Sequence, residues 1–268
     1  MINKIALIIK IYFVGLFILF IASDVYATDY FVSSGTGSNL SPGTTQASPI
    51  RNVSLWTLPP SPIAGDKLKA GDRVFFKRGE EWVAGDAQWD VTATGIAGSP
   101  ITFDAYGTGP NPLFTGARTA AAIGKGANTW TQYAAGSGIW YNVAGTVNWY
   151  CNSVVEDGAK PLWKAGSIAT MKLGTFYSDT SKLYVWTTDG ARPDAPTLYI
   201  AKNPTDDAYR GLVKVGKGGG SSYILFKNLD ARMSNTQGFT SSGEYQEFWN
   251  CNASFNGRDG FYFIKNAV

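Results

Sequence analysis

An internal repeat of 22 residues near the C-terminal end limits the fold of this sequence more than any other feature. The matching pairs are Tyr223/Tyr245, Phe226/Phe248, Asn228/Asn250, Ala231/Ala253, Gly238/Gly260 and Phe239/Phe261. A fixed period of about 20 to 30 residues, made of short strands and turns, is typical of solenoid proteins, because one repeat buries its apolar face only against the next. The repeat therefore predicts an all-β solenoid of stacked coils.

Alternation within the repeat predicts which side chains point inward. These are Ile224, Phe226, Leu229 and Ala231 in one coil, and Phe248, Cys251 and Ala253 in the next. Asn228 and Asn250 fall between two short strands, where the backbone must turn sharply. Because asparagine tolerates the left-handed conformation and its amide can bond to a stacked copy, we expect a structural asparagine ladder rather than a pair of sugar ligands.

Composition excludes several classes of function. The sequence contains no histidine, which rules out Ser-His-Asp and Cys-His catalysis and histidine-ligated metals. Only 16% of the residues are charged, the net charge is +3, and lysine and arginine are never clustered, so nucleic-acid binding is not indicated. Any chemistry must use carboxylates, lysine, arginine, tyrosine or a metal held by oxygen atoms.

Residues 1–27 have the pattern of a secretory signal. Lys4 and Lys10 precede an apolar run over residues 11–22, and a Val-Tyr-Ala ending predicts cleavage after Ala27. A retained membrane anchor is the alternative interpretation. Cleavage would make the protein secreted, periplasmic or attached to the cell surface, with no membrane contact afterwards. Export permits a disulfide between Cys151 and Cys251, but the apolar ladder position of Cys251 favours a free thiol.

Three regions follow the signal. Residues 28–119 are predicted to form an N-terminal cap and the first coils; they include a capping helix at 49–58, because Ser48 and Pro49 precede Ile50, Val53 and Trp56 at helical spacing. Residues 120–211 contain Asp-Gly turns between short aromatic strands and predict an inserted β-hairpin region. Residues 212–268 carry the regular coils.

Several stretches of the chain resemble secreted right-handed parallel β-helix proteins of the pectate-lyase-like superfamily. The resemblance rests on residues 29–38 (DYFVSSGTGS), 70–80 (AGDRVFFKRGE), 98–107 (GSPITFDAYG), 155–159 (VEDGA), 174–179 (GTFYSD) and 183–190 (LYVWTTDG). It implies a right-handed parallel β-helix with an N-terminal capping helix. Such proteins usually have more coils, so the chain is expected to be the N-terminal portion of a longer one.

The resemblance also implies a polysaccharide as substrate or ligand, with no obligate protein partner. In β-elimination of a uronate, a base removes the proton next to the sugar carboxylate, and Ca²⁺ or a cationic side chain stabilises the carbanion. Arg258 and Asp259 are the candidate catalytic pair, because they precede a strand on the sheet that carries the cleft in related proteins. Asp206 and Asp207 are candidate Ca²⁺ ligands, and Trp249 and Tyr262 are outward-facing candidates for stacking on sugar rings.

The sequence thus favours a secreted carbohydrate-active protein, with a polysaccharide lyase acting on a uronate polymer as the first hypothesis. A non-catalytic glycan-binding surface or adhesin protein and a glycoside hydrolase of the same fold are the alternatives.

Overall fold

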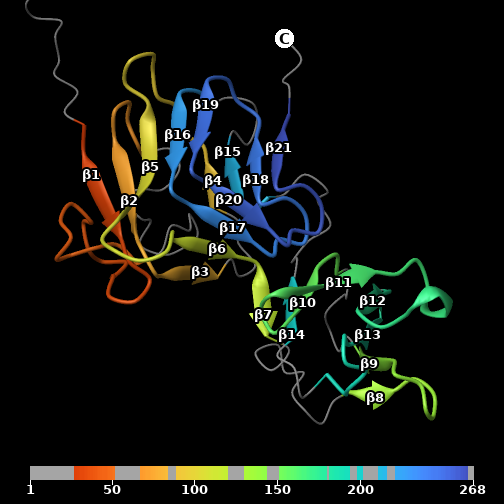
Figure 1. Ribbon diagram of the computed structural model, residues 1–268. Helices are drawn as coiled ribbons and strands as arrows, with labels where there is room; N and C mark the ends of the chain where they lie inside the picture. The colour runs from red at the N-terminus through yellow and green to blue at the C-terminus, as the bar shows by residue number, and fades with distance from the viewer. Residues whose placement is uncertain are drawn as a thin grey trace, which may run out of the picture.

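The computed structural model describes residues 27–51, 67–83, 89–119, 130–143, 151–179, 181–193, 198–201, 211–215 and 221–264. Among these residues the regular elements are β-strands, apart from one short 3₁₀ turn, η3 (Ile168–Thr170). The strands form three parallel sheets and one larger, mostly antiparallel sheet (Figure 1). The predicted all-β architecture is confirmed. The predicted signal segment lies outside the described residues except for Ala27, and no helix in the described part of the chain is long and apolar enough to cross a bilayer.

Three parallel sheets carry the repeat. The first sheet contains, in order, β1 (Asp29–Val32), β2 (Arg73–Lys77), β5 (Ile101–Tyr106), β16 (Ile224–Lys227) and β19 (Gln246–Trp249). The second contains β3 (Glu81–Val83), β6 (Leu113–Thr115), β17 (Asp230–Arg232) and β20 (Asn252–Ser254). The third contains β4 (Trp89–Val91), β15 (Val213–Val215), β18 (Phe239–Ser241) and β21 (Phe261–Phe263).

Each pass of the chain visits these sheets in the same order. The four passes are β2-β3-β4, β5-β6-β15, β16-β17-β18 and β19-β20-β21. The strand register places residues of the sequence repeat directly beside each other: Phe226 pairs with Phe248, Ala231 with Ala253 and Phe239 with Phe261. Parallel strands lie about 4.8 Å apart, so like side chains stack from one pass to the next.

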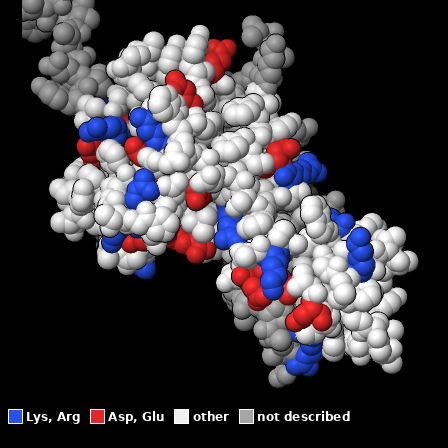
Figure 2. Space-filling view, in the orientation of Figure 1, with Lys and Arg blue, Asp and Glu red and all other residues white. Residues whose placement is uncertain are grey.

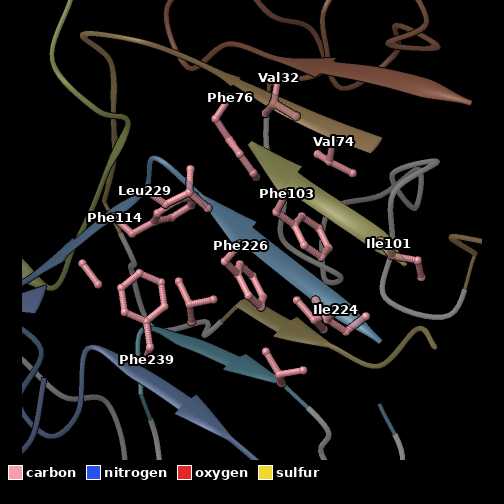
Figure 3. Packing of buried hydrophobic residues seen from close by; sticks show 14 of the residues in the cluster. Val32, Val74, Phe76, Ile101, Phe103, Phe114, Ile224, Phe226, Leu229 and Phe239 are labelled. Atoms are coloured by element: carbon pink, nitrogen blue, oxygen red, sulfur yellow. The ribbon is translucent and has the colours of Figure 1, made fainter. Parts of the chain in front are cut away.

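Aromatic columns fill the interior between the three sheets (Figure 3). The Phe226 ring stacks on Phe103 at 5.0 Å and on Phe248 at 5.0 Å, with interplanar angles of 12° and 8°. Phe239 stacks on Phe261 at 5.1 Å in the adjacent column. Ile224, Phe226, Leu229 and Ala231 are at most 1% exposed, as the alternation predicts. Burial of this apolar surface is the main force that holds the passes together.

The corners between sheets adopt the left-handed conformation at regular intervals. Six non-glycine residues there have φ between 50° and 55°, in pairs 22 residues apart: Tyr223/Tyr245, Asn228/Asn250 and Met233/Phe255. Asn250 Nδ2 donates to Asn228 Oδ1 at 2.7 Å, and Asn228 Nδ2 donates to Asp104 Oδ1 at 2.7 Å. The predicted asparagine ladder is therefore confirmed, and Asp104 extends it to a third coil.

The predicted capping helix at 49–58 is wrong at its start, and residues 52–58 lie outside the described residues. Residues 49–51 are not helical: Ile50 bridges Val32 in parallel, and its side chain is fully buried. The Ile50 amide donates to the Phe31 carbonyl at 2.8 Å, and the Ser33 amide donates to the Ile50 carbonyl at 2.8 Å. The open edge of β1 needs backbone partners, and supplying them outweighs the local helical signal.

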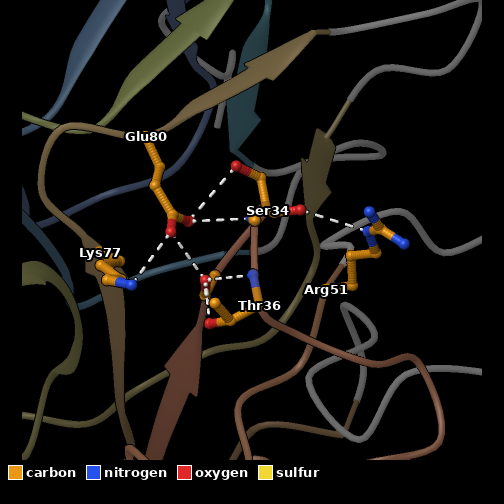
Figure 4. A network of polar contacts seen from close by, with 7 residues as sticks. Ser34, Thr36, Arg51, Lys77 and Glu80 are labelled. Carbon is orange, nitrogen blue, oxygen red and sulfur yellow. Dashed lines mark hydrogen bonds and ion pairs between the residues drawn. The ribbon is translucent and has the colours of Figure 1, made fainter.

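A loop over residues 33–50 therefore covers this edge, and Glu80 fixes it in place (Figure 4). The Glu80 carboxylate accepts hydrogen bonds from the Ser33 hydroxyl at 2.8 Å and the Gly35 amide at 3.3 Å, and it pairs with Lys77 at 3.3 Å. Partial burial raises the pKa of the Glu80 carboxyl, but these hydrogen bonds and the lysine outweigh it, so the pKa is lowered overall.

An eight-stranded sheet is inserted between the second and third parallel sheets of one pass, after β6 and before β15. Its strands are, in spatial order, β7 (Ala117–Thr119), β14 (Leu198–Ala201), β10 (Val154–Glu156), β11 (Lys160–Lys164), β12 (Thr175–Ser178), β13 (Lys182–Trp186), β9 (Trp140–Val143) and β8 (Thr131–Gln132). Only the pair β11–β12 is parallel among them. This inserted sheet has its own apolar clusters, and Cys151 is buried in one of them. Both cysteines are free, as predicted.

Candidate functional site at the junction of the coils and the inserted sheet

The inserted sheet leaves the coils at the corner between the second and third parallel sheets. The corresponding corners of the next two passes are the loops after β17 and after β20, so all three corners lie on the same side of the stack. In Figure 1 the inserted sheet extends from this side. We call the junction the contact between residues 232–240 and 255–259 of the coils and residues 151–164 of the inserted sheet.

Direct polar contacts hold the junction together. The Asn152 amide donates to Asn235 Oδ1 at 2.6 Å, and Asn152 Nδ2 donates to the Asn235 carbonyl at 3.1 Å. The Ser153 hydroxyl donates to the Phe255 carbonyl at 2.6 Å. Gly257 permits this approach, because a Cβ atom there would lie 2.4 Å from Asn152 Cβ. Among the described residues, the two parts are thus joined through hydrogen bonds, and their buried apolar clusters are separate.

The junction also contains buried polar atoms that have no hydrogen-bond partner among the described residues. They are Arg232 Nε, Gln237 Oε1, Thr240 Oγ1 and Asn256 Nδ2. Gln237 is 2% exposed and Thr240 is fully buried. Buried polar groups are nearly always paired, so several unpaired ones in one region of a fold indicate a place where a ligand or water completes the bonding.

Arg232 is the most buried cation of this region whose contacts are defined. Its guanidinium donates to the Gly158 carbonyl and lies 4.7 Å from the centre of the Phe255 ring. These contacts use one edge and one face of the group and leave Nε without a described partner. Because Nε is itself buried, a ligand outside the junction does not reach it, and Arg232 holds the inserted sheet to the coils.

Lys164 and Lys160 lie on the same strand, but their pKa values are shifted in opposite directions. Lys164 Nζ donates to Asn152 Oδ1 at 2.6 Å, and although the side chain is exposed overall, desolvation around its ammonium lowers its pKa. The hydrogen bond from Lys160 to Asp157, 3.0 Å long, raises the pKa of Lys160 instead. Lys164 therefore gives up its proton more readily than Lys160. Figure 2 shows basic and acidic side chains together where the two parts of the molecule meet.

The predicted catalytic pair, Arg258 and Asp259, lies in the loop over residues 255–259 on the coil side of the junction. The Arg258 amide donates to the Thr236 carbonyl at 2.9 Å, and the Asp259 carbonyl accepts from the Gly238 amide at 3.1 Å. Both side chains are exposed. The backbone of each residue is therefore fixed against the loop of the preceding pass, whereas the side chains project from it.

The predicted aromatic residues are not brought together. Trp249 is 59% exposed on the first parallel sheet, where its indole donates to Glu247 Oε2 at 2.8 Å. Tyr262 is half-buried on the third sheet, opposite Thr240 of β18. The two residues therefore lie on different sheets of the stack. Asp206 and Asp207 lie outside the described residues.

The site residues predicted from the sequence did not include Asn152, Lys164, Asn235, Gln237 and Asn256. A signal for the last three is present in the repeat, because the polar run Ser234–Gln237 aligns with the polar run Asn256–Asp259 at the same offset of 22 residues. Two polar loops stacked at one corner indicate a shared surface. Asn152 and Lys164 had no such signal, since only the tertiary structure brings the inserted sheet to this corner.

No family model matches the sequence, and no curated protein matches it. A search of solved structures finds a likeness to XylC in its complex with xylose, with a TM-score of 0.53 and 14% sequence identity. The match covers 82% of this chain and 40% of the XylC chain, so this chain spans less than half of that protein. At this identity the likeness shows a shared fold.

Two weaker likenesses accompany it. One is to the GH136 lacto-N-biosidase from Eubacterium ramulus, with a TM-score of 0.43, 16% identity, and coverage of 90% of this chain and 31% of the other. The second is to a glycoside hydrolase, with a TM-score of 0.42, 11% identity, and coverage of 78% of this chain and 51% of the other.

Proposed function

We propose that this chain is part of a secreted right-handed parallel β-helix protein that acts on a polysaccharide at the junction. The exposed side chains of Arg258 and Asp259 carry this proposal, because they project from the junction beside the polar loop of the preceding pass, and a few polar groups at fixed positions are what a hydroxyl-rich sugar requires. The shared fold with XylC, whose solved complex contains xylose, supports the same class of ligand.

The charges of the junction favour an acidic sugar. Arg258 is exposed at the junction, and its guanidinium can pair with a uronate carboxylate. That pairing also stabilises the negative charge that develops when the proton next to the carboxylate is removed. We therefore retain β-elimination of a uronate polymer as the first candidate reaction.

Lys164 is our candidate for the base. Its lowered pKa increases the fraction of neutral amine, which is the form that accepts a proton. In the elimination, Lys164 takes the proton beside the carboxylate, the released electron pair forms the new C=C bond, and the bond to the leaving glycosidic oxygen breaks. That oxygen then takes a proton from a water molecule or from the Lys164 ammonium formed in the first step. Lys160, which is ion-paired, serves as the control.

Calcium stays a prediction, and we derive no step through it. Among the described residues, no group of three or more acidic side chains is gathered in the way that Ca²⁺ requires. The predicted ligands Asp206 and Asp207 lie outside those residues.

Glycoside hydrolysis is the second candidate function. Hydrolysis needs two carboxyl groups on either side of the scissile bond. Asp259 is one exposed carboxylate at the junction. A glycan-binding protein without catalysis is the third candidate.

Incubation of the full chain with polyuronates and with xylan, each with and without Ca²⁺, tests these candidates. An unsaturated product that absorbs ultraviolet light supports elimination, and new reducing ends without that absorbance support hydrolysis. Binding without either product supports the glycan-binding function, and neither binding nor product overturns the proposal. For elimination, we expect Lys164→Gln and Arg258→Gln to abolish product formation and Lys160→Gln to leave it intact.

A further inference from the structure

A row of tyrosines crosses one face of the inserted sheet. Tyr177 of β12 pairs directly with Tyr184 of β13, which pairs directly with Tyr141 of β9. The ring centres of Tyr177 and Tyr141 lie 5.9 Å and 5.8 Å from that of Tyr184. Directly paired strand residues project on the same face of a sheet, so these rings form a continuous aromatic strip, which we call the tyrosine row.

The tyrosine row lies on the opposite face from the larger apolar cluster of the inserted sheet. Phe176, Leu183 and Val185 alternate with the row along β12 and β13 and are at most 1% exposed in that cluster. On the side of the row, Tyr184 is 5% exposed and is flanked by Tyr133, whose ring meets it edge-on at 5.8 Å. Tyr184 forms a small buried cluster with Ile139 and Met171, and Tyr141 and Tyr177 pack against it, so only the exposed parts of Tyr133, Tyr141 and Tyr177 are open to a ligand.

Several aromatic side chains on this face are partly or largely exposed. Tyr133 is 49% exposed, and Tyr141 and Tyr177 are half-buried. The neighbouring row on the same face is formed by Trp163, Thr175 and Trp186, which pair across β11, β12 and β13. Trp163 is 77% exposed. Large exposed aromatic side chains gathered on one face of a sheet mark a binding surface more often than a packing surface.

The polar groups of the row indicate the kind of ligand. No hydrogen bond joins the hydroxyls of Tyr133, Tyr141, Tyr177 or Tyr184 to another described residue. Lys182 lies on the same face, with Nζ 4.5 Å from the centre of the Tyr141 ring. The Asp179 carboxylate is close enough to interact electrostatically with Lys182 and with Tyr184. The surface therefore combines apolar ring faces with open hydroxyls, the Lys182 ammonium and the Asp179 carboxylate.

We propose that the tyrosine row and Lys182 form a second saccharide-binding site, separate from the junction, that holds an acidic oligosaccharide. The class of sugar rests on the proposed function. Pyranose rings have apolar C–H faces that stack on tyrosine, and their hydroxyls match the open tyrosine hydroxyls. Lys182 supplies the charge for a uronate carboxylate. The row would retain a polymer while another stretch of it occupies the junction.

Affinity electrophoresis of the full chain in gels that contain polyuronate or neutral xylan tests this site. We expect Tyr133→Ala and Tyr141→Ala each to weaken polyuronate binding about two- to tenfold, the size of one aromatic contact. Tyr141→Phe keeps the ring and should lose less. Lys182→Gln should weaken binding to polyuronate and leave binding to xylan unchanged. Tyr245→Ala, which removes an exposed tyrosine from the coils, is the control. Urea midpoints of all variants verify that they fold.

The outcomes separate this inference from the proposed function. In the wild type and in Arg258→Gln, polyuronate binding that depends on Tyr141 supports the second site, whether or not the junction is catalytic. Polyuronate binding that is unchanged in Tyr133→Ala, Tyr141→Ala and Lys182→Gln overturns it, even if turnover occurs at the junction. Self-association through the tyrosines, measured by sedimentation without saccharide binding, also overturns it and identifies the face as a contact between copies of the chain.

Discussion

The asparagine ladder at the corner between the first and second parallel sheets gives the sharpest test of the stacked structure. Asn228 has a φ of 54°, donates to Asp104 and accepts from Asn250, with both hydrogen bonds at 2.7 Å. Replacement by alanine removes both bonds. It also strains the backbone, because alanine has a Cβ atom that disfavours the left-handed conformation and no polar side chain that could offset this cost. Replacement by glycine removes the same bonds, but glycine adopts that conformation without strain.

The magnitudes follow from these contacts. A neutral hydrogen bond contributes about 0.5–1.5 kcal/mol and one to a charged group about 1.5–3 kcal/mol, with the lower values appropriate for the half-buried Asn228. We therefore expect Asn228→Gly to reduce the free energy of unfolding by about 2 kcal/mol. The left-handed conformation costs a non-glycine residue about 1–2 kcal/mol, so Asn228→Ala should lose about 3–4 kcal/mol.

Urea unfolding followed by tryptophan fluorescence and circular dichroism measures both variants against the wild type. Each kcal/mol corresponds to a shift of about 2–4 °C in Tm for a domain of this size. Asn252→Ala is the matched control, because Asn252 makes one ladder bond, to Asp230 at 2.9 Å, from within a β-strand. Equal stabilities for Asn228→Gly and Asn228→Ala would refute the reasoning about backbone conformation, and a wild-type stability for both would refute the ladder.

Further predictions concern the core, the covered edge and the cysteines. Phe226→Ala should lower the free energy of unfolding by about 3–5 kcal/mol, because it empties the middle of the phenylalanine column; a urea-measured loss below about 1 kcal/mol would contradict the stacking. Glu80→Gln should destabilise the protein by about 1–2 kcal/mol at neutral pH. Because the pKa of Glu80 is lowered in the folded state, its stabilisation is present above the ordinary glutamate pKa and is lost as pH falls through the folded value, so the two urea midpoints should converge in acid. Burial raises the pKa of the Cys151 thiol to about 12, so alkylation followed by peptide mass spectrometry should modify the half-buried Cys251 first and Cys151 only after unfolding; early labelling of Cys151 would contradict its burial.

Local sequence signals failed where a distant strand edge competed with them. The Ser-Pro start and the helical spacing of Ile50, Val53 and Trp56 predicted a helix, but Phe31 and Ser33 on β1 take the backbone groups of Ile50 as partners. A strand edge left open costs more than the local helical preference contributes, and the identity of the neighbouring edge is invisible in a short window of sequence.

Some residues of the candidate site could be predicted from the sequence, and others could not. Arg258 and Asp259 were identified because they precede a strand, and both lie at the junction. Asn152 meets Asn235 across 83 residues of sequence, and no spacing rule connects them. The outward orientation of Trp249 and Tyr262 follows from alternation, but alternation does not say that the two residues belong to different parallel sheets.

The sequence by itself determined the stacking of the coils. A repeat of 22 residues places Phe226 beside Phe248 and Asn228 beside Asn250, because in-register parallel pairing requires only that equivalent residues recur at a constant interval. Only the tertiary structure decided where the inserted sheet docks, which polar groups it buries at the junction, and which tyrosines align across its strands. Those contacts join segments that share no period, and they are hydrogen bonds between two parts of the chain whose buried apolar clusters are separate.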